Sequence, residues 1–406
     1  MTIIEFFDRE SAIENIAGSL LYLPDKVVFV GSNSKRMKKS IEDYKSVLNG
    51  RGINVDFLFK TVGKNNLTPI TDAIESIINE NGECGIDISG GDELFLVAVG
   101  TMLEKYKDKI KIHRLNISNN SMTDCDSEGR LCRSLPVFLS VEENIRIYGG
   151  RVIYDNEKPN STFVWNYDED FVSDIYAMWD ICKRNVGAWN AQTNAVAKFC
   201  NLSTDKSGLK VSAKIDVDKN RAFISENILN SLEKCGIIKN LRIGERLSFE
   251  FKNSQIKKCL TKAGQLLEHI IAVTASEAKD DNGNLIYNSI GSGVYIDWDG
   301  VVHQDSRADV ENEIDVIFMK GMIPVFVSCK NGSVDTDELY KLSVVAERFG
   351  GKYVRKVLVA TQLNDMGYRA EYIRARARDM NIKLVENIDS MDIKELSDTV
   401  SKFWIR

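Results

Sequence analysis

The chain has 406 residues, 43% of them hydrophobic and only 5 of them proline, so it can build sizeable cores and lacks a disordered composition. This length predicts two or three domains rather than one. A net charge of −6 excludes a global attraction to nucleic acid, so any such binding must come from local patches.

Hydropathy and cysteine usage exclude further classes. No apolar run is long enough to span a membrane, and the N-terminal MTIIEFFDRE lacks the basic head of a signal peptide. The eight cysteines form no CxxC pair, and with only three histidines a zinc site is not expected. Scattered free cysteines predict a reducing, cytoplasmic location with no membrane partner.

Residues 1–115 alternate buried-strand and amphipathic-helix patterns, which predicts a doubly wound parallel sheet in an α/β domain. Ser11 is the expected N-cap of the first helix, and Glu14 three residues later predicts a capping box. The expected strands are 3–7, 26–30, 55–59, 85–88 and 109–115, and the expected helices are 11–23, 35–48, 68–78 and 92–106.

Ligands of such sheets bind at the carboxyl ends of the strands. Three polar turns are expected there, at 8–11, 31–34 and 87–92. In the third, Ser89, Gly90 and Gly91 precede a helix, so backbone N–H groups and the helix dipole can hold an anion. The turn is neither GxGxxG nor a Walker loop, and a plain tight turn is an equally good interpretation.

The middle of the chain predicts connecting structure. Residues 116–163 are expected to be β-rich, with a loop at 118–129 and strands at 136–141 and 144–148. Residues 171–199 predict a helix pair whose aromatic side chains serve a core or a dimer contact rather than base stacking. The helix and strand–turn–strand pattern at 222–252 predicts a small winged-helix-like module, which can contact nucleic acid or act as a spacer.

The last region predicts a second α/β unit. LTKAGQLLEHIIAV (260–273) has the spacing of an amphipathic helix, with Glu268 among the inward residues. The strands that follow are expected at 291–298, 313–319, 323–329, 356–360 and 383–385, and the helices at 336–349 and 369–380.

Two neighbouring strands of this unit carry the chemistry. Alternation places Glu311, Glu313 and Asp315 on one face of the first strand, and Ser328 and Lys330 on one face of the second. A carboxylate beside a lysine suits metal-assisted cleavage of a phosphodiester. A polar-edged hairpin with a surface lysine is the alternative interpretation.

The order Glu268, Asp315, Ser328-x-Lys330, on a helix and two strands, resembles the PD-(D/E)xK nuclease superfamily. The resemblance implies that Asp315 binds Mg²⁺ or Mn²⁺ together with the carbonyl of Cys329. It also implies that Lys330 orients or deprotonates the attacking water and stabilises the phosphorane. Glu268 would help to hold the metal or its water.

One position departs from that pattern, because Ser328 stands where the superfamily usually has an acid and cannot supply negative charge to a cation. Some members take the missing carboxylate from the following helix, which favours Glu338 here and leaves Glu347 as the alternative. Gln362, after the strand KVLVA, is a candidate to position phosphate or water. A nuclease fold that has lost its activity is the remaining interpretation.

The chain as a whole resembles the CARF nucleases of type III CRISPR systems. The resemblance rests on FFDRESAIENI, KVVFVGSN, DISGGDE, KAGQLLE, GVYIDWDG, ENEIDV and VSCKNG, which are spread over nearly the whole length. It implies a CARF domain at 1–160, a helical linker with the winged-helix-like module at 161–255, and a PD-(D/E)xK restriction-endonuclease-like domain at 256–406. The ligand residues carried over by position are Asp8, Ser11, Asn15, Ser32, Asn33, Ser89, Gly90, Gly91 and Asp92.

The family resemblance implies a homodimer in which cyclic oligoadenylate, commonly cyclic tetraadenylate, activates a metal-dependent endonuclease that cuts DNA, RNA or both. The two subunits would hold the ligand through N–H and hydroxyl groups. A basic surface for the nucleic acid substrate is expected at 352–383. Two alternatives stay open: a nucleotide-sensing DNA-binding regulator with an inactive nuclease fold, and a restriction-type endonuclease that ignores the second messenger.

Overall fold

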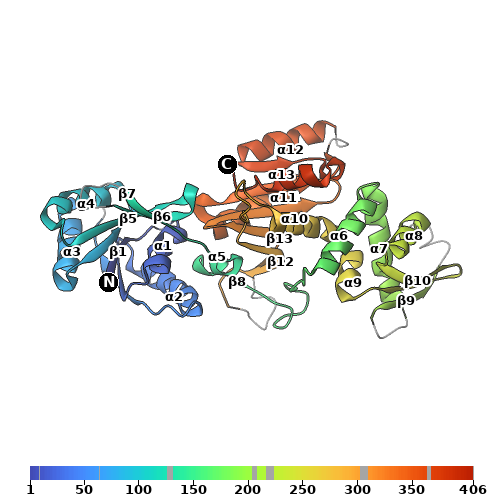
Figure 1. Cartoon of the computed structure of the whole chain (residues 1–406), viewed down its shortest axis with the longest axis horizontal. Helices are drawn as coiled ribbons and strands as arrows, with labels where there is room; N and C mark the ends of the chain where they lie inside the picture. Colours follow the sequence, from blue (N-terminus) through green and yellow to red (C-terminus); the bar gives the residue numbers. More distant parts are fainter. Residues whose placement is uncertain are drawn as a thin grey trace.

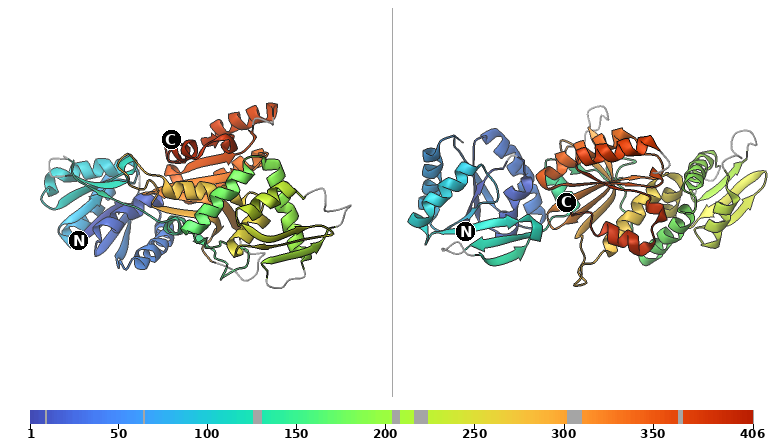
Figure 2. Two further views of the ribbon diagram at one scale, coloured as in Figure 1. Left: turned by 45° about the vertical axis from the view of Figure 1, so that its right-hand side comes forward. Right: turned by 90° about the horizontal axis from the view of Figure 1, so that it is seen from above.

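The computed structural model describes residues 1–406 except 9, 64, 126–130, 204–207, 216–223, 302–309, 364–366 and 406, and the side chains of 131–134. Arg9, in the first predicted turn, therefore lies outside the described residues. The chain is elongated, with a seven-stranded sheet at one end, a six-stranded sheet in the middle and a three-stranded sheet at the other end (Figures 1 and 2). Across the described ranges, no helix combines the length and hydropathy of a membrane span.

The first sheet has the order β3-β2-β1-β4-β5-β6-β7 and is parallel from β3 to β5. In β2, Val27 and Phe29 face the helices α1 and α2, whereas Val28 and Val30 face α3 and α4. Because both faces are covered, the strand is apolar throughout, as a doubly wound sheet requires. The elements are β1 (Thr2–Phe6), α1 (Ala12–Tyr22), β2 (Lys26–Gly31), α2 (Ser34–Gly50), β3 (Asp56–Thr61), α3 (Leu67–Asn81), β4 (Cys84–Asp87), α4 (Glu93–Tyr106), β5 (Ile110–Asn116), η1 (Ile117–Asn119), β6 (Ser121–Cys125) and β7 (Leu131–Pro136).

Residues 118–152 differ from the prediction. The predicted loop contains β6, because Asn120 adopts a left-handed conformation (φ 48°) that reverses the chain after η1. The strands predicted at 136–141 and 144–148 are wrong: α5 (Val141–Ile147) lies there and begins with a complete capping box between Ser140 and Glu143. β8 (Arg151–Val152), within the range expected for the first domain, pairs with β12 of the middle sheet.

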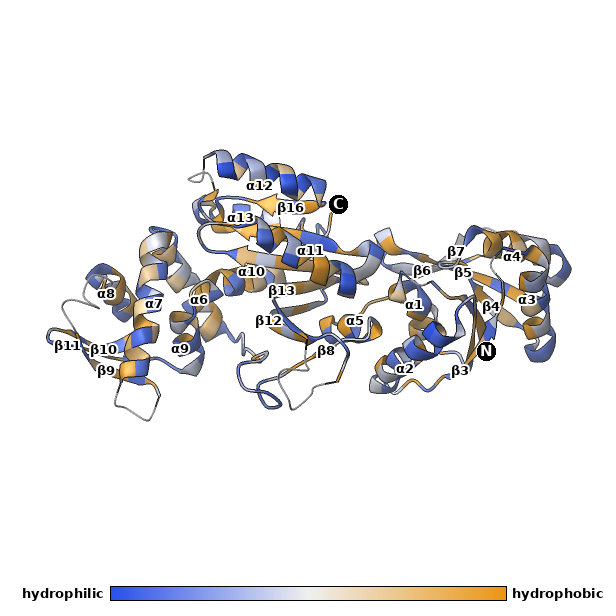
Figure 3. Ribbon diagram, turned by 180° about the vertical axis from the view of Figure 1, so that it is seen from behind, coloured by the Kyte–Doolittle hydropathy of each residue, from blue (hydrophilic) through white to orange (hydrophobic). Residues whose placement is uncertain are grey.

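The middle sheet has the order β16-β15-β14-β13-β12-β8. Helices α10 and α13 pack on one face and α11 and α12 on the other, where α12 is largely hydrophilic on its outside (Figure 3). The elements are α9 (Ser254–Thr261), α10 (Gln265–Glu277), β12 (Ser289–Asp297), β13 (Glu311–Lys320), β14 (Ile323–Lys330), α11 (Thr336–Gly350), η3 (Gly351–Tyr353), β15 (Arg355–Ala360), α12 (Tyr368–Asp379), β16 (Ile382–Val385), η5 (Ile388–Ser390) and α13 (Ile393–Val400).

The helix predicted at 260–273 is two helices. α9 ends at Thr261, and α10 begins after Gly264, whose φ of 91° a helix cannot contain. α10 is buried on nearly every side rather than amphipathic, because α6 and α13 enclose it together with the sheet. The C-terminal helix α13 was not predicted.

The third sheet has the antiparallel order β10-β11-β9 and confirms the predicted helix and hairpin. β9 was not predicted; it pairs with the second strand of the hairpin. Trp179 and Trp189 of the helix pair are 0% and 1% exposed, so the aromatic side chains belong to the core as expected. The elements are α6 (Glu169–Cys182), α7 (Val186–Leu202), β9 (Lys210–Lys214), α8 (Glu226–Lys234), β10 (Ile238–Ile243) and β11 (Arg246–Phe251).

The turn between β4 and α4 packs directly against β1. A Cβ atom added at Gly90 would lie 2.9 Å from the backbone oxygen of Phe6, and one added at Gly91 would lie 2.6 Å from the Cβ of Phe6. Gly91 also has a φ of 90°, which L side chains rarely adopt. The backbone shape of this turn therefore depends on both glycines.

Gly90→Ala should lower the free energy of unfolding by about 1–3 kcal/mol, because the new methyl group must displace backbone atoms. Gly100→Ala is the matched control: Gly100 lies in α4 with no atom within 4 Å of an added Cβ, so alanine should stabilise by about 0.5–1 kcal/mol. Urea unfolding of both variants measures the difference. Equal stability of the two variants would contradict the close approach to β1.

Candidate active site and ligand face

Asp315 of β13 is held by the neighbouring strand β14. Its Oδ2 accepts hydrogen bonds from the backbone N–H of Cys329 at 2.6 Å and from Oγ of Ser328 at 3.2 Å, and Nζ of Lys330 lies 4.0 Å away. The predicted juxtaposition of the carboxylate and the lysine is therefore present. Ser328 does not add charge, but it donates a hydrogen bond that orients Asp315.

Glu338 lies in the first turn of α11, beside Lys330, but its carboxylate forms ion pairs with two lysines. Its carboxylate lies 2.8 Å from Lys330 and 3.1 Å from Lys341. Burial opposes its ionisation, and the two lysines outweigh burial, so the pKa of Glu338 is lowered. Asp315, Ser328, Lys330 and Glu338 line one cavity of about 250 Å³. Glu347, the alternative carboxylate, instead lies 2.7 Å from Lys356 and lines a different cavity.

Glu268 of α10 reaches the site from the other face of the sheet. The residue is 5% exposed, and its Oε2 has no hydrogen-bond partner. Burial, and then the negative charge of Asp315, raise the pKa of Glu268 to about 8. Burial also raises the pKa of Asp315. A buried and a partly buried carboxyl group therefore repel each other here, and a cation between them would relieve that repulsion.

This donor set fits a hard divalent cation. Such cations prefer oxygen ligands and complete their shell with water, backbone carbonyls or substrate phosphate. Glu268 and Asp315 are the side chains that would hold Mg²⁺ or Mn²⁺, with the predicted carbonyl of Cys329. Among the described residues, no three histidine, cysteine, aspartate or glutamate side chains are grouped for metal binding, so Glu338 would join only by leaving Lys330.

Gln362 follows β15 in a strained conformation. Its φ is 52°, which is uncommon outside glycine. The backbone N–H of Thr361 donates to the carbonyl of Lys330 at 3.1 Å, so this turn is anchored beside the site. Gln362 is not among the residues that line the active-site cavity, and its role toward phosphate or water stays a prediction.

A cavity of about 540 Å³ lies at the carboxyl edge of the first sheet. Asp8 and Asn33 of the predicted ligand residues line it, and so do cationic side chains that the prediction missed. Burial lowers the pKa of Arg348, and the charge of Arg36 lowers it further against the opposing effect of Asp43. Two guanidinium groups near one cavity favour an anion. The cationic lining residues are Lys35, Arg36, Lys39 and Arg348.

Three predicted ligand residues instead shape the turns. Ser11 is fully buried and caps α1. Asn15, 1% exposed, accepts from the N–H of Asp8 at 2.8 Å and donates to its carbonyl at 2.7 Å. Ser89 donates to Asp87 and accepts from the N–H of Leu115 at 2.6 Å. Their side chains therefore reach a ligand only if these bonds open.

Of the other predicted ligand positions, all except Gly90 are accessible. Ser32, Asn33, Gly91 and Asp92 are exposed, and Gly90 is buried against β1. Asn33 caps α2 by accepting from the N–H of Arg36 at 3.1 Å. Asp92 occupies the N-cap position of α4, and its side chain makes no capping hydrogen bond.

The first turn also contacts the middle unit directly. Lys352 of η3 lies 3.2 Å from Asp8 and 2.7 Å from Glu14, and the hydroxyl of Tyr353 donates to Glu14. Glu14 is therefore drawn to η3, and the reciprocal half of the predicted capping box is not present. Sequence patterns could not reveal this contact, because its partners are 344 and 339 residues apart.

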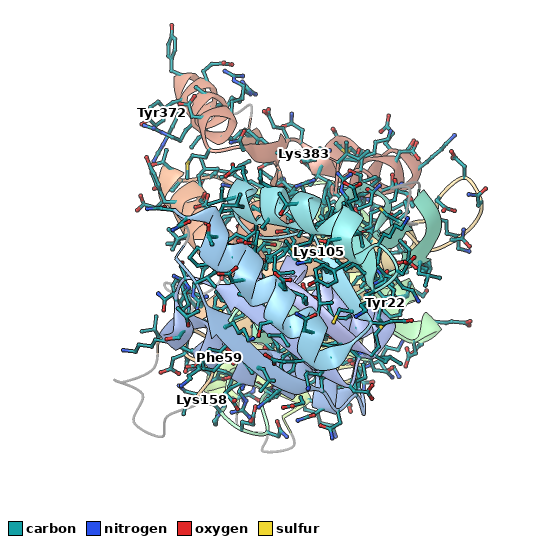
Figure 4. All side chains as sticks on the ribbon, turned by 90° about the vertical axis from the view of Figure 1, so that its left-hand side faces the viewer. Tyr22, Phe59, Lys105, Lys158, Tyr372 and Lys383 are labelled. Carbon is teal, nitrogen blue, oxygen red and sulfur yellow. The ribbon has the colours of Figure 1, made fainter. Side chains whose placement is uncertain are left out.

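The predicted basic surface is only partly present. Lys352 pairs with the buried Glu14, Lys356 pairs with the exposed Glu347, and Arg374 pairs with Glu386. Arg376 instead lies over the ring of Tyr372, 5.6 Å from its centroid. Tyr372 is 53% exposed on the outer side of α12 (Figure 4).

Comparison with known proteins bears on the unit that contains this site. Residues 294–403 match the family model described as "Card1-like, endonuclease domain". These residues form a Card1-like endonuclease domain. It contains Asp315, Ser328, Lys330 and Glu338, whereas Glu268 precedes the matched range. No curated protein matches the chain.

Two solved structures share the fold of nearly the whole chain. The crystal structure of protein VC1899 from Vibrio cholerae has a TM-score of 0.70 and 18% identity, covering 99% of this chain and 97% of that one. Can2 from Sulfobacillus thermosulfidooxidans, in complex with cyclic tetra-adenylate, has a TM-score of 0.64 and 14% identity, covering 98% and 97%. The Card1-like endonuclease domain thus stands in a shared three-part architecture.

The raised pKa of Glu268 predicts a pH-dependent stability. Its ordinary pKa is 4.5 and its folded pKa is about 8, so its contribution is fully present below pH 4.5 and is lost as the pH rises to about 8. In metal-free protein, Glu268→Gln should therefore become more stable than the wild type across that range. Urea unfolding in a chelator, at pH values on both sides of the range, measures this difference.

Glu277→Gln is the matched control for this experiment, because Glu277 lies exposed at the end of the same helix. Its stability is the reference against which the pH dependence of Glu268→Gln is compared. Mg²⁺ or Mn²⁺ added at high pH should raise the free energy of unfolding of the wild type but not that of Glu268→Gln. If the difference in the free energy of unfolding between Glu268→Gln and the wild type did not change with pH, the raised pKa of Glu268 would be wrong.

Proposed function

We propose that this chain is a metal-dependent endonuclease of type III CRISPR defence that cyclic oligoadenylate activates. The observation that carries the proposal is the carboxylate–lysine site of the Card1-like endonuclease domain, directly connected to a sheet with a cationic cavity at its ligand edge. Cyclic tetraadenylate is the first activator to test, because the similar structure of Can2 contains it. The protein would act in the cytoplasm as a homodimer.

The catalytic steps follow from the side chains of the site. Glu268 and Asp315 would hold Mg²⁺ or Mn²⁺, which when bound supplies Lewis acidity to the scissile phosphate. Lys330 would orient the attacking water and balance the charge that develops on the phosphorane. Ser328 fixes Asp315, and Glu338 holds the ammonium of Lys330 in position at 2.8 Å.

Activation would use the contacts between the first sheet and α11. Arg348 lines the ligand-side cavity and belongs to the last turn of α11, whose first turn carries Glu338. Lys352, two residues beyond that helix, binds Asp8 in the first turn. A phosphate that draws Arg36 and Arg348 together would move α11 relative to β14, and so change how Glu338 engages Lys330.

A second candidate is a ligand-sensing DNA-binding regulator without cleavage. The observation in its favour is the bonding of Glu338 to two lysines, because a carboxylate engaged in this way does not complete a metal shell in the described site. Binding of DNA that depends on the activator, without cleavage in any divalent metal, would favour this candidate.

The activation proposal predicts cleavage only in the presence of the ligand. Plasmid DNA and single-stranded DNA and RNA are incubated with Mn²⁺ or Mg²⁺, with and without a panel of cyclic oligoadenylates. We expect cleavage with cyclic tetraadenylate and a metal, and none with either alone. Equal cleavage without any ligand would instead indicate a restriction-type endonuclease.

Substitutions in the site should separate catalysis from ligand binding. Asp315→Asn and Lys330→Ala should each lower the cleavage rate by roughly 10²–10³-fold or more. The first removes a charged metal ligand, and the second removes a positive charge that stabilises the transition state. Calorimetry should show unchanged affinity for the activator.

Glu338→Gln and Glu347→Gln form the matched pair on α11. Glu338→Gln should lose most of the activity, because it releases Lys330 and removes the candidate carboxylate, whereas Glu347→Gln should retain activity. Full activity of Glu338→Gln would exclude a role of this carboxylate in cleavage.

A further inference from the structure

Next to the active-site cavity lies another cavity, which Glu313 also lines. It has a volume of about 220 Å³, and we name it the flanking cavity. Its lining includes Lys262 of the turn after α9, Gly293 and Tyr295 of β12, and four residues before α6, which are Asn160, Ser161, Phe163 and Trp165. The two cavities therefore share Glu313 as a lining residue.

Glu313 is fixed at this border by two partners. Lys262 forms an ion pair with its Oε1, and the hydroxyl of Tyr295 donates to its Oε2 at 2.8 Å. The Lys262 side chain remains 45% exposed. An ion pair this exposed contributes about 1 kcal/mol or less, and an ammonium has three donors, so Lys262 can bind a phosphate while it stays near Glu313.

The far side of the flanking cavity combines a second lysine with aromatic rings. Nζ of Lys258 lies 3.6 Å from the ring centroid of Phe163 and 2.9 Å from Asp155. Trp165 packs edge-on against Phe163 with centroids 4.8 Å apart. Proteins that bind unpaired nucleic acid use this combination, in which cations bind the backbone and rings contact bases.

The wall of the flanking cavity lies close to the catalytic carboxylate of Glu268. Gly293, which lines the cavity, has a φ of 60°, and a Cβ atom added there would lie 3.9 Å from the unpartnered Oε2 of Glu268. A side chain at this position would therefore be in contact with Glu268.

We propose that the flanking cavity binds the nucleotide next to the scissile phosphodiester, with its phosphate on Lys262 and its base or sugar against Phe163 and Trp165. The proposal rests on the nuclease function proposed above and adds a path for the substrate strand across Glu313. Lys262 then binds substrate, whereas Tyr295 is a positioning residue that holds Glu313 and thereby the ammonium of Lys262.

The test pairs a substitution in the protein with a neutral group in the substrate. An oligonucleotide whose cleavage position is mapped with the wild type is remade with one uncharged methylphosphonate, either 5′ or 3′ of the scissile phosphate. KM and kcat are measured with metal and activator for the wild type and Lys262→Gln. Lys257→Gln is the matched control, because Lys257 lies on the preceding helix α9 and its Nζ points toward Gly208.

One of the two methylphosphonates should raise the KM of the wild type roughly tenfold, which is the effect of one charge-assisted hydrogen bond. Lys262→Gln should show the same rise with the unmodified strand and no further rise with that methylphosphonate. Lys262→Arg should restore much of the affinity, and Lys257→Gln should match the wild type.

Additive effects of the substitution and of both methylphosphonates would overturn the proposal, and so would an unchanged KM in Lys262→Gln. Thermal unfolding checks that Lys262→Gln is folded, and Lys258→Gln provides a second variant of the same cavity. If the wild type cleaves no strand, this result contradicts the proposed nuclease function and not the binding of a nucleotide in the flanking cavity. In that case, fluorescence anisotropy of the unmodified strand with the wild type, Lys262→Gln and Lys257→Gln gives the decisive comparison through binding.

Discussion

The Glu14 carboxylate is only 4% exposed, and its charge is balanced by Lys352 from another part of the chain. Burial raises the pKa of Glu14, and hydrogen bonds from Lys352 and Tyr353 oppose that rise. A buried carboxylate without its partner costs several kcal/mol, so this pair fixes how the first sheet meets the endonuclease domain. An apolar cluster that runs from α1 and α2 through α5 to α11 supports the same arrangement.

Charge is arranged in a comparable way around the catalytic residues. Glu268 is a buried acid whose ionisation the charge of Asp315 disfavours, while Lys262 and Lys330 at the margins favour it. Without a cation, full ionisation of both carboxyl groups is unfavourable in such a site. The hydroxyl of Ser328 suits this balance, because a third acid there would add repulsion and a hydroxyl adds a donor to Asp315.

The sequence was sufficient for features with a local cause. The apolar runs placed the parallel strands, and alternation along β13 and β14 placed Asp315 beside Lys330. The strands predicted within 136–148 were wrong, because the apolar spacing there suits a short strand as well as a helix. The capping box at Ser140 is the local feature that favours the helix. The pairs Glu14–Lys352 and Glu338–Lys330 join residues whose partners only the tertiary fold selects, so their engagement was not predictable.

The edge strand β8 has a consequence for dissecting this protein. Arg151 and Val152 complete the sheet of the endonuclease domain, yet the chain then leaves for the three-stranded unit before it returns at α9. The domain is therefore assembled from two separated segments. A fragment that begins after β8 would leave the edge of β12 unpaired, and unpaired edges recruit other strands and aggregate. Proteolysis between β8 and α9 would, by contrast, leave both segments in place, so a nicked chain should remain associated where a truncated one does not.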